Sequence, residues 1–198
     1  MNAISPGFAD PALDGQCVFR AVMEALARPA RPRRLAGLAG PPPPLTPELA
    51  AIALALADHE TPLWLDAPLH QAPAVPAFLR FHTGAPIAEH PAAATFALLA
   101  DPARCPSPEA FAEGTPDYPD RSTTLVFAVQ RLSEDAGCWF EGPGINGRAR
   151  LGTAPLPPDF PARLARNHAR FPLGIDLLLT APMLVAGLPR SIRVVAEG

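Results

Sequence analysis

Three polar residues that lie close together in the chain could bind an anion. Arg80, His82 and Thr83 combine a guanidinium, an imidazole and a hydroxyl within four positions, and Gly84 follows them. An arginine fork matches the oxygens of a phosphate or carboxylate, and a glycine lets the backbone approach a bound group. Two interpretations remain open: an anion site, or a helix end where His82 and Thr83 cap backbone groups and Arg80 faces water.

Two further segments carry groups that could hold or attack a ligand. Gly142 and Gly144 flank a proline after an expected strand, and such a turn either cradles an anion with its amides or simply reverses the chain. Ser122 and Thr124 adjoin an apolar strand, where their hydroxyls complete turn hydrogen bonds or act as nucleophiles. No G-x-S-x-G elbow accompanies them.

A third group of polar residues lies near the ends of the expected elements. Asp176 opens an apolar strand, where a carboxylate is costly unless it is paired, and Arg190 is one possible partner. The full set of candidate ligand-binding residues is Arg80, His82, Thr83, Gly84, Ser122, Thr124, Gly142, Gly144, Asn167, Asp176 and Arg190.

Several chemistries are excluded or disfavoured by residues that the chain lacks. All 16 basic residues are arginine, so a lysine Schiff base and a P-loop are impossible, although GC-rich coding alone would also deplete lysine. Cys17, Cys105 and Cys138 are far apart and form no C-x-x-C pair, which argues against a disulfide framework or a cysteine zinc site. His59 is a weak metal-binding motif, because no second histidine lies four residues after it. We therefore expect neither a metal nor a cofactor.

Length and composition are typical of one globular domain, which we expect to span residues 1–198. The chain is 48% hydrophobic and 18% charged. A net charge of -3 and a pI near 5.9 imply no basic surface for nucleic acid. No secretory leader and no uninterrupted apolar stretch of about 18 residues is present, so we expect a cytoplasmic protein that does not enter membranes.

Apolar periodicity predicts the elements that must position these groups. Spacings of three and four predict helices at 11–27, 46–57, 75–81, 108–113 and 159–169. Asp10 and Thr46 are the expected caps of the first two helices. Short apolar runs predict strands at 61–65, 95–99, 123–129, 138–141, 175–180 and 192–195. Their alternation with helices favours a three-layer α/β/α sandwich with strands covered on both faces.

The order of motifs along the whole chain resembles one known family, the H subunit of the bacterial carbon-phosphorus lyase core complex (PhnH). The resemblance extends from residue 7 to about residue 195. It is carried by Gly7-Phe8-Ala9-Asp10-Pro11, Gln16, Phe19-Arg20, Met23, Ala25, Trp64-Leu65, Phe81-His82-Thr83-Gly84-Ala85, Tyr118-Pro119, Ser122-Thr123-Thr124-Leu125, Gly142-Pro143-Gly144-Ile145, Asn167, Phe171-Pro172, Gly174-Ile175-Asp176 and Leu188-Pro189-Arg190.

The resemblance implies a cytoplasmic subunit of phosphonate catabolism that joins G, I and J subunits and forms a homodimer when isolated. In that family the G, H, I and L subunits are associated with displacing adenine from a nucleoside triphosphate by a phosphonate, which gives a ribose 1-phosphonate 5-triphosphate. The iron-sulfur chemistry that breaks the carbon-phosphorus bond belongs to the J subunit. The dispersed cysteines of this chain agree with that division.

The resemblance also implies a fold similar to that of the pyridoxal-phosphate-dependent transferases, with a mixed sheet between helix layers. The family does not use that cofactor, and the missing lysine independently excludes an internal aldimine. Two positions depart from the family pattern. Ala30 follows Pro29 where a glycine is expected, so a turn with positive φ would strain it, and Ser191-Ile192 replaces a pair of threonines.

Three functions follow as hypotheses. The first is a subunit without a complete active site, which supports a multi-subunit transferase. The second is a phosphate- or nucleotide-binding subunit whose regulatory or substrate-holding cleft joins Arg80, His82 and Thr83 to the Gly142–Ile145 turn. The third, an independent hydrolase with Ser122 or Cys138 as nucleophile, is the least favoured because no base motif lies near either residue.

Overall fold

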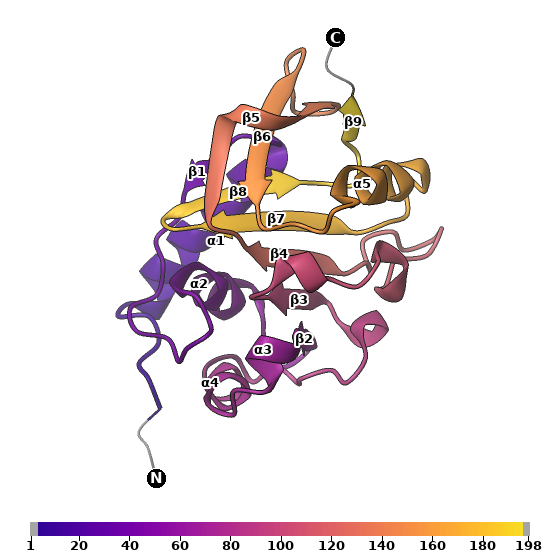
Figure 1. Cartoon of the computed structure of the whole chain (residues 1–198). Coiled ribbons are helices and arrows are strands. Elements are labelled where there is room, and N and C mark those ends of the chain that lie inside the picture. Colours follow the sequence, from indigo (N-terminus) through magenta and orange to yellow (C-terminus); the bar gives the residue numbers. More distant parts are fainter. Residues whose placement is uncertain (1–3, 196–198) are drawn as a thin grey trace.

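The computed structural model describes residues 4–195 and shows an α/β protein built on a six-stranded and a three-stranded sheet (Figure 1). The helices are α1 (Pro11–Ala27), α2 (Pro47–Leu56), α3 (Ala67–His70), α4 (Ala74–Thr83) and α5 (Phe160–Ala169). The strands are β1 (Arg33–Arg34), β2 (Leu63–Leu65), β3 (Phe96–Leu99), β4 (Thr124–Ala128), β5 (Arg131–Glu141), β6 (Ala149–Ala154), β7 (Asp176–Ala181), β8 (Leu184–Leu188) and β9 (Arg193–Val195).

The first helix forms where the apolar spacing predicts it. The Asp10 carboxylate caps α1 by accepting hydrogen bonds from the amides of Ala12 and Leu13, and a proline occupies the first turn. Val18 and Val22 are buried against the sheet, whereas the opposite side of the helix faces solvent. These contacts confirm the predicted helix over residues 11–27.

The second helix is buried, as its nearly continuous apolar sequence predicts. The Thr46 hydroxyl accepts a hydrogen bond from the Leu49 amide at the start of α2. Glu48 is also buried, and one oxygen of its carboxylate accepts a hydrogen bond from the Met183 amide at 2.9 Å. Met183 has a φ of 61° in the tight turn between β7 and β8. Glu48 therefore ties the start of α2 to that turn.

The larger sheet has the order β1-β8-β7-β4-β3-β2, and its last four strands, from β7 to the edge strand β2, are parallel. Strand β8 returns antiparallel beside β7, and β1 adds a short antiparallel edge. The register aligns Leu98, Val126 and Leu178 on neighbouring strands, and all three are completely buried. Strands covered on both faces need no polar alternation, which explains their continuous apolar sequences.

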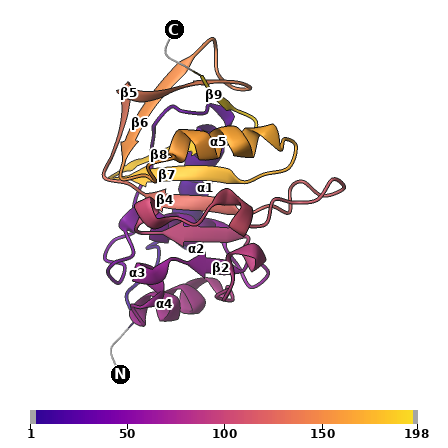
Figure 2. The same ribbon diagram turned by 45° about the vertical axis from the view of Figure 1, so that its right-hand side comes forward.

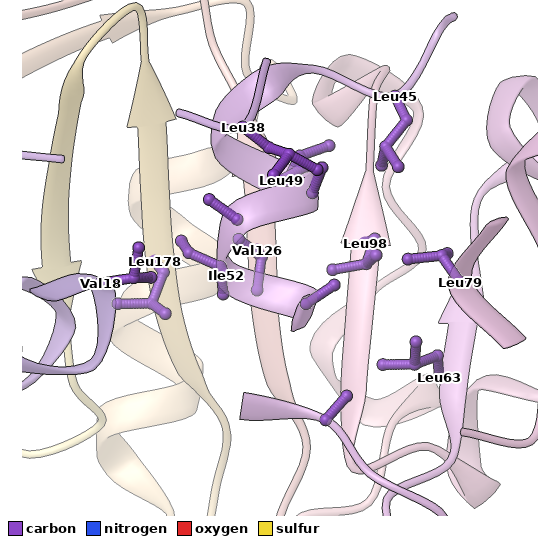
Figure 3. Packing of buried hydrophobic residues seen from close by; sticks show 14 of the residues in the cluster. Val18, Leu38, Leu45, Leu49, Ile52, Leu63, Leu79, Leu98, Val126 and Leu178 are labelled. Atoms are coloured by element: carbon purple, nitrogen blue, oxygen red, sulfur yellow. The ribbon is translucent and has the colours of Figure 1, made fainter. Parts of the chain in front are cut away.

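The two faces of the large sheet bury different sets of side chains. One face packs against α1, α2 and α4, and Figure 3 shows Ile52 and Leu49 of α2 between the strands and the loop that carries Leu38. The other face packs against α5 and the small antiparallel sheet β6-β5-β9. The predicted helix layer on this second face is therefore only partly correct, because a sheet covers much of it.

Several elements differ from the sequence predictions. Strand β5 is much longer than the predicted 138–141, because its first half pairs with β6, which is rich in small and polar residues and was not predicted. Strands β1 and β8 and the helix α3 were also missed. The helix predicted at 108–113 is only a 3-10 turn, Pro108–Ala110. Ala30 has a φ of 60°, as expected if its turn requires the conformation that glycine prefers.

No helix within the described residues is long and apolar enough to cross a membrane.

Candidate functional site

The structure gathers several predicted residues at the amino-terminal edge of two parallel strands. Thr124 opens β4 and Asp176 opens β7, and the two residues are register partners. Ser122 lies just before β4, and Arg190 follows β8 on the other side of β7. We call Ser122, Asp176 and Arg190 the amino-edge cluster.

Arg190 is the centre of the amino-edge cluster and is paired with Asp176, which the sequence had left as one possibility. Its Nη2 lies 2.5 Å from Asp176 Oδ2, and its Nε and backbone amide both donate to Oδ1, at 3.2 and 2.8 Å. The same guanidinium donates to the Pro119 carbonyl at 2.7 Å and to the Ser122 hydroxyl at 2.5 Å. Because these contacts use most of its donors and neutralise its charge, Arg190 is a structural clamp with little capacity for an external anion.

Asn167 supports the same edge from α5. Its amide group donates to the carbonyl of Ile175 and accepts from the amide of Ile175, both at 2.9 Å. A Cβ on Gly174, whose φ is 119°, would lie 2.7 Å from the Asn167 side-chain oxygen. The neighbouring His168 hydrogen-bonds the Arg190 carbonyl through Nδ1 at 3.2 Å. The end of α5 is thus fastened to the start of β7.

Glu113 is a member of this region that the sequence analysis did not single out. Its carboxylate pairs with Arg170, while its other oxygen, Oε1, is buried and has no hydrogen-bond partner among the described residues. The backbone of Glu113 bridges that of Ser122 and accepts a hydrogen bond from Gly174. No local sequence signal marks it, because its partners lie far away in the chain.

The geometry does not support an activated nucleophile at either predicted position. The Ser122 oxygen accepts from Arg190, and among residues 4–195 no histidine or carboxylate is hydrogen-bonded to it. Cys138 is half-buried on β5, and burial raises the pKa of its thiol, which disfavours the reactive thiolate. An independent hydrolase therefore has no structural support here.

The end of α4 contains Arg80, His82, Thr83 and Gly84. Of the two interpretations that the sequence left open, this arrangement matches the second, a helix end. The Thr83 hydroxyl donates to the Leu79 carbonyl at 2.7 Å and accepts from the Ala85 amide at 3.0 Å. Gly84 closes the helix with a φ of 72°. His82 Nε2 lies 2.9 Å from the Ser5 carbonyl oxygen, so it holds the N-terminal segment. Arg80 faces solvent.

Gly142 and Gly144 lie far from α4, in the turn that follows β5. A Cβ on Gly142 would come within 3.0 Å of the Ile192 Cα, and a Cβ on Gly144 within 2.4 Å of the Ala27 carbonyl oxygen. Figures 1 and 2 show α4 next to β2 at one end of the molecule and β5 beyond β7 and β8 at the other. The predicted cleft between these two segments is therefore not formed, because the large sheet separates them.

At the opposite edge, where the parallel strands end, a buried carboxylate also stabilises the fold. Asp66 follows β2, and its two oxygens accept hydrogen bonds from the Leu69 amide at 3.3 Å and the Asp101 amide at 2.8 Å. Burial raises the pKa of Asp66, and these two hydrogen bonds partly oppose that shift. Among the residues that the structure describes, no three His, Cys, Asp or Glu side chains are grouped as a metal site.

Comparisons with known proteins agree over nearly the whole chain. The family model for "Bacterial phosphonate metabolism protein (PhnH)" matches residues 6–195. The "Alpha-D-ribose 1-methylphosphonate 5-triphosphate synthase subunit PhnH" of Rhizobium meliloti (strain 1021) is 42% identical over 193 residues, which cover 98% of this chain and 96% of that protein. A provisionally named C-P lyase subunit protein, HtxG of Stutzerimonas stutzeri, is 32% identical over 85 residues, 43% of this chain and 44% of its own. The chain belongs to the PhnH family of bacterial phosphonate metabolism proteins.

Proposed function

We propose that this protein is the H subunit of an α-D-ribose 1-methylphosphonate 5-triphosphate synthase and acts in organic phosphonate catabolism. The observation that carries the proposal is the 42% identity to the Rhizobium meliloti subunit, which extends over 96% of that protein. The part of the relative that has no counterpart in this chain is too short to be a separate domain. We further propose that residues 1–198 form one domain of this family.

The proposed role within the synthase is to support the reaction rather than to supply its complete active site. The amino-edge cluster is internally neutralised, and Ser122 has no hydrogen-bonded base among the described residues. These contacts support a subunit that assembles with other subunits or holds a ligand. The phosphonate and the nucleoside triphosphate would then react at a site completed by other subunits.

We propose that the fold is related to that of the pyridoxal-phosphate-dependent transferases, and that the protein does not share their cofactor chemistry. The mixed sheet with a parallel centre supports this relationship, although a shared fold alone would not establish function. The chain contains no lysine, so it has no ε-amine with which to bind the aldehyde of pyridoxal phosphate as an internal aldimine.

We propose the G, I and J subunits as partners, a cytoplasmic location, and a homodimer when the subunit is isolated. Exposed apolar side chains on α1 support an interaction surface: Leu13 is 58% exposed, Phe19 50% and Met23 49%.

Two measurements test the subunit assignment. The tagged full chain is co-expressed with G, I and J subunits, and co-purification of all three is expected, with a preparation lacking the tag as control. The gene is also expected to restore growth of Rhizobium meliloti lacking its PhnH on methylphosphonate as sole phosphorus source. Growth on inorganic phosphate controls for general fitness. Failure of both association and growth, with the chain soluble and folded, would overturn the assignment.

A further inference from the structure

Five arginines are concentrated in a short part of a chain whose net charge is negative. Between Asp14 and Glu48 the chain has five arginines and a single acidic residue, Glu24. We call these five residues the arginine surface; they are Arg20, Arg28, Arg31, Arg33 and Arg34.

The fold brings the arginine surface together at one edge of the large sheet. Arg20 lies on the solvent side of α1, and Arg28 is the C-cap residue of that helix. Arg33 and Arg34 form β1, which pairs with Val185 and Leu184 of β8 and contacts α1. The chain turns back after α1 to reach this edge, so the helix and the strand present their arginines side by side.

Two adjoining hollows lie on the arginine surface and share one residue. The first, of about 480 Å³, is lined by Arg20, Arg33 and Arg34, together with Glu24 and apolar side chains of α1. The second, of about 490 Å³, is lined by Arg28, Arg31 and Arg33, with Gly144 and Asn146. Volumes of this order suit a small ligand, and Arg33 connects the two hollows.

Within residues 4–195, the positive charges of the arginine surface are not neutralised by ion pairs. Its five side chains form no ion pair or hydrogen bond with any residue in the described range 4–195. In contrast, Arg163, Arg170 and Arg190 are all paired with carboxylates. Glu24, the acidic residue of the first hollow, forms no ion pair with them, so the surface retains an excess of positive charge.

The strongest indication of a ligand is an unsatisfied atom of Arg33. Its Nε is buried and has no hydrogen-bond partner among the described residues, and Arg33 is the residue that lines both hollows. A buried donor without an acceptor costs free energy, so such atoms are uncommon in folded proteins. An anion seated over Arg33 would supply that acceptor and at the same time neutralise the neighbouring guanidinium groups.

We infer that the arginine surface binds the polyphosphate chain of a small molecule, of the class of a nucleoside or ribose 5-triphosphate. Guanidinium forks match phosphate oxygens, and a row of linked phosphates can contact both hollows at once, which a single phosphate cannot. The choice of a triphosphate rests on the proposed function, since the related subunit is named for a synthase whose product carries one. The inferred site is separate from the amino-edge cluster.

Calorimetric titration of the full chain tests this site with sodium tripolyphosphate, ATP and inorganic phosphate as probes. Tripolyphosphate is expected to bind at least about tenfold more tightly than inorganic phosphate, and more weakly as salt is raised from low to physiological concentration. ATP should bind like tripolyphosphate, because the phosphates make the contacts. Bound tripolyphosphate should also raise the melting temperature.

Matched variants separate a built site from general charge attraction. Arg33→Gln is expected to lower tripolyphosphate affinity about tenfold, since it removes the shared guanidinium. Arg104→Gln removes the same charge from an exposed arginine outside the hollows and is expected to change affinity less than twofold. Unchanged melting temperatures of both variants without ligand would show that folding is intact.

Two results would overturn the inference: no heat and no thermal shift with tripolyphosphate at low salt, or equal losses for Arg33→Gln and Arg104→Gln. Co-purification with the G, I and J subunits is scored separately on the same proteins. If the wild-type chain assembles but does not bind tripolyphosphate, the subunit assignment stands and only the polyphosphate site fails. If Arg33→Gln abolishes assembly while the wild type binds no polyphosphate, the surface recognises an acidic partner and the inference is equally overturned.

Discussion

Replacing Arg190 by methionine tests whether the amino-edge cluster stabilises the fold. Methionine keeps a long unbranched side chain but removes every guanidinium donor. Asp176 then loses its ion pair, and the carbonyl of Pro119 and the hydroxyl of Ser122 each lose a donor. These groups lie on two segments, the start of β7 and the segment before β4, and Arg190 follows β8, so the variant loosens the connection between all three.

The expected cost follows from the burial of the pair. The side chain of Arg190 is 12% exposed and that of Asp176 is 23% exposed. Removing one partner of a fully buried ion pair costs roughly 3–5 kcal/mol. Because water still reaches part of Asp176, we expect about 2–4 kcal/mol, which corresponds to a melting temperature lower by roughly 10 °C for a chain of this length.

Urea unfolding and limited proteolysis provide the assay. Arg193→Met is the matched control, because Arg193 is 61% exposed and its pair with Glu141 should contribute little. A double-mutant cycle with Asp176→Asn should give a coupling free energy of about 1–3 kcal/mol. Trypsin should cleave after the exposed Arg121 faster in Arg190→Met, since the nearby Pro119 carbonyl is released. If Arg190→Met is no less stable than Arg193→Met and the coupling is near zero, the cluster is not a clamp.

Two further predictions concern the turn after β5 and the buried thiol. Gly144→Ala should destabilise the protein by more than about 2 kcal/mol in urea unfolding, because its φ is 82° and the added Cβ would lie 2.4 Å from the Ala27 oxygen. Gly147→Ala, with a φ of 71° but open space, should cost only about 1 kcal/mol, and equal losses would contradict the packing argument. Burial raises the pKa of Cys105 to about 12, so at pH 8 only about one thiol in ten thousand is ionised and Ellman's reagent should modify it only after unfolding. The exposed Cys17 should react at once, and a fast phase that persists when both Cys17 and the half-buried Cys138 are replaced by serine would refute this assignment.

The fold was predictable where the sequence carries a local signal. The Asp10 cap and the apolar spacing located α1, and continuous apolar runs located β3, β4 and β7. Strands β6 and β8 were missed because both contain alanine and glycine, and β6 also threonine, and these small side chains give no clear alternation. These strands form because their partners β5 and β7 are already in place, which is a tertiary effect.

The candidate site was predictable only in part. The cost of an unpaired carboxylate at the start of a buried strand correctly pointed from Asp176 to Arg190. The cleft between α4 and the Gly142–Gly144 turn was not formed, because short-range spacing says nothing about which side of a sheet a segment reaches. The net charge of -3 predicted no basic surface for nucleic acid, but a net charge does not show where arginines lie, and five of them lie at or near the β1 edge.

The sequence by itself determined the family, the chemistry that the chain cannot perform, and the apolar segments that must be buried. The absence of lysine excludes an internal aldimine in any conformation, because it depends on composition alone. Only the tertiary structure decided that Arg190 is neutralised, while Arg33 has a buried donor that finds no partner within residues 4–195. Both residues are arginines with the same intrinsic charge, and their capacity to bind an anion differs because only contacts between distant segments determine which charge is already paired.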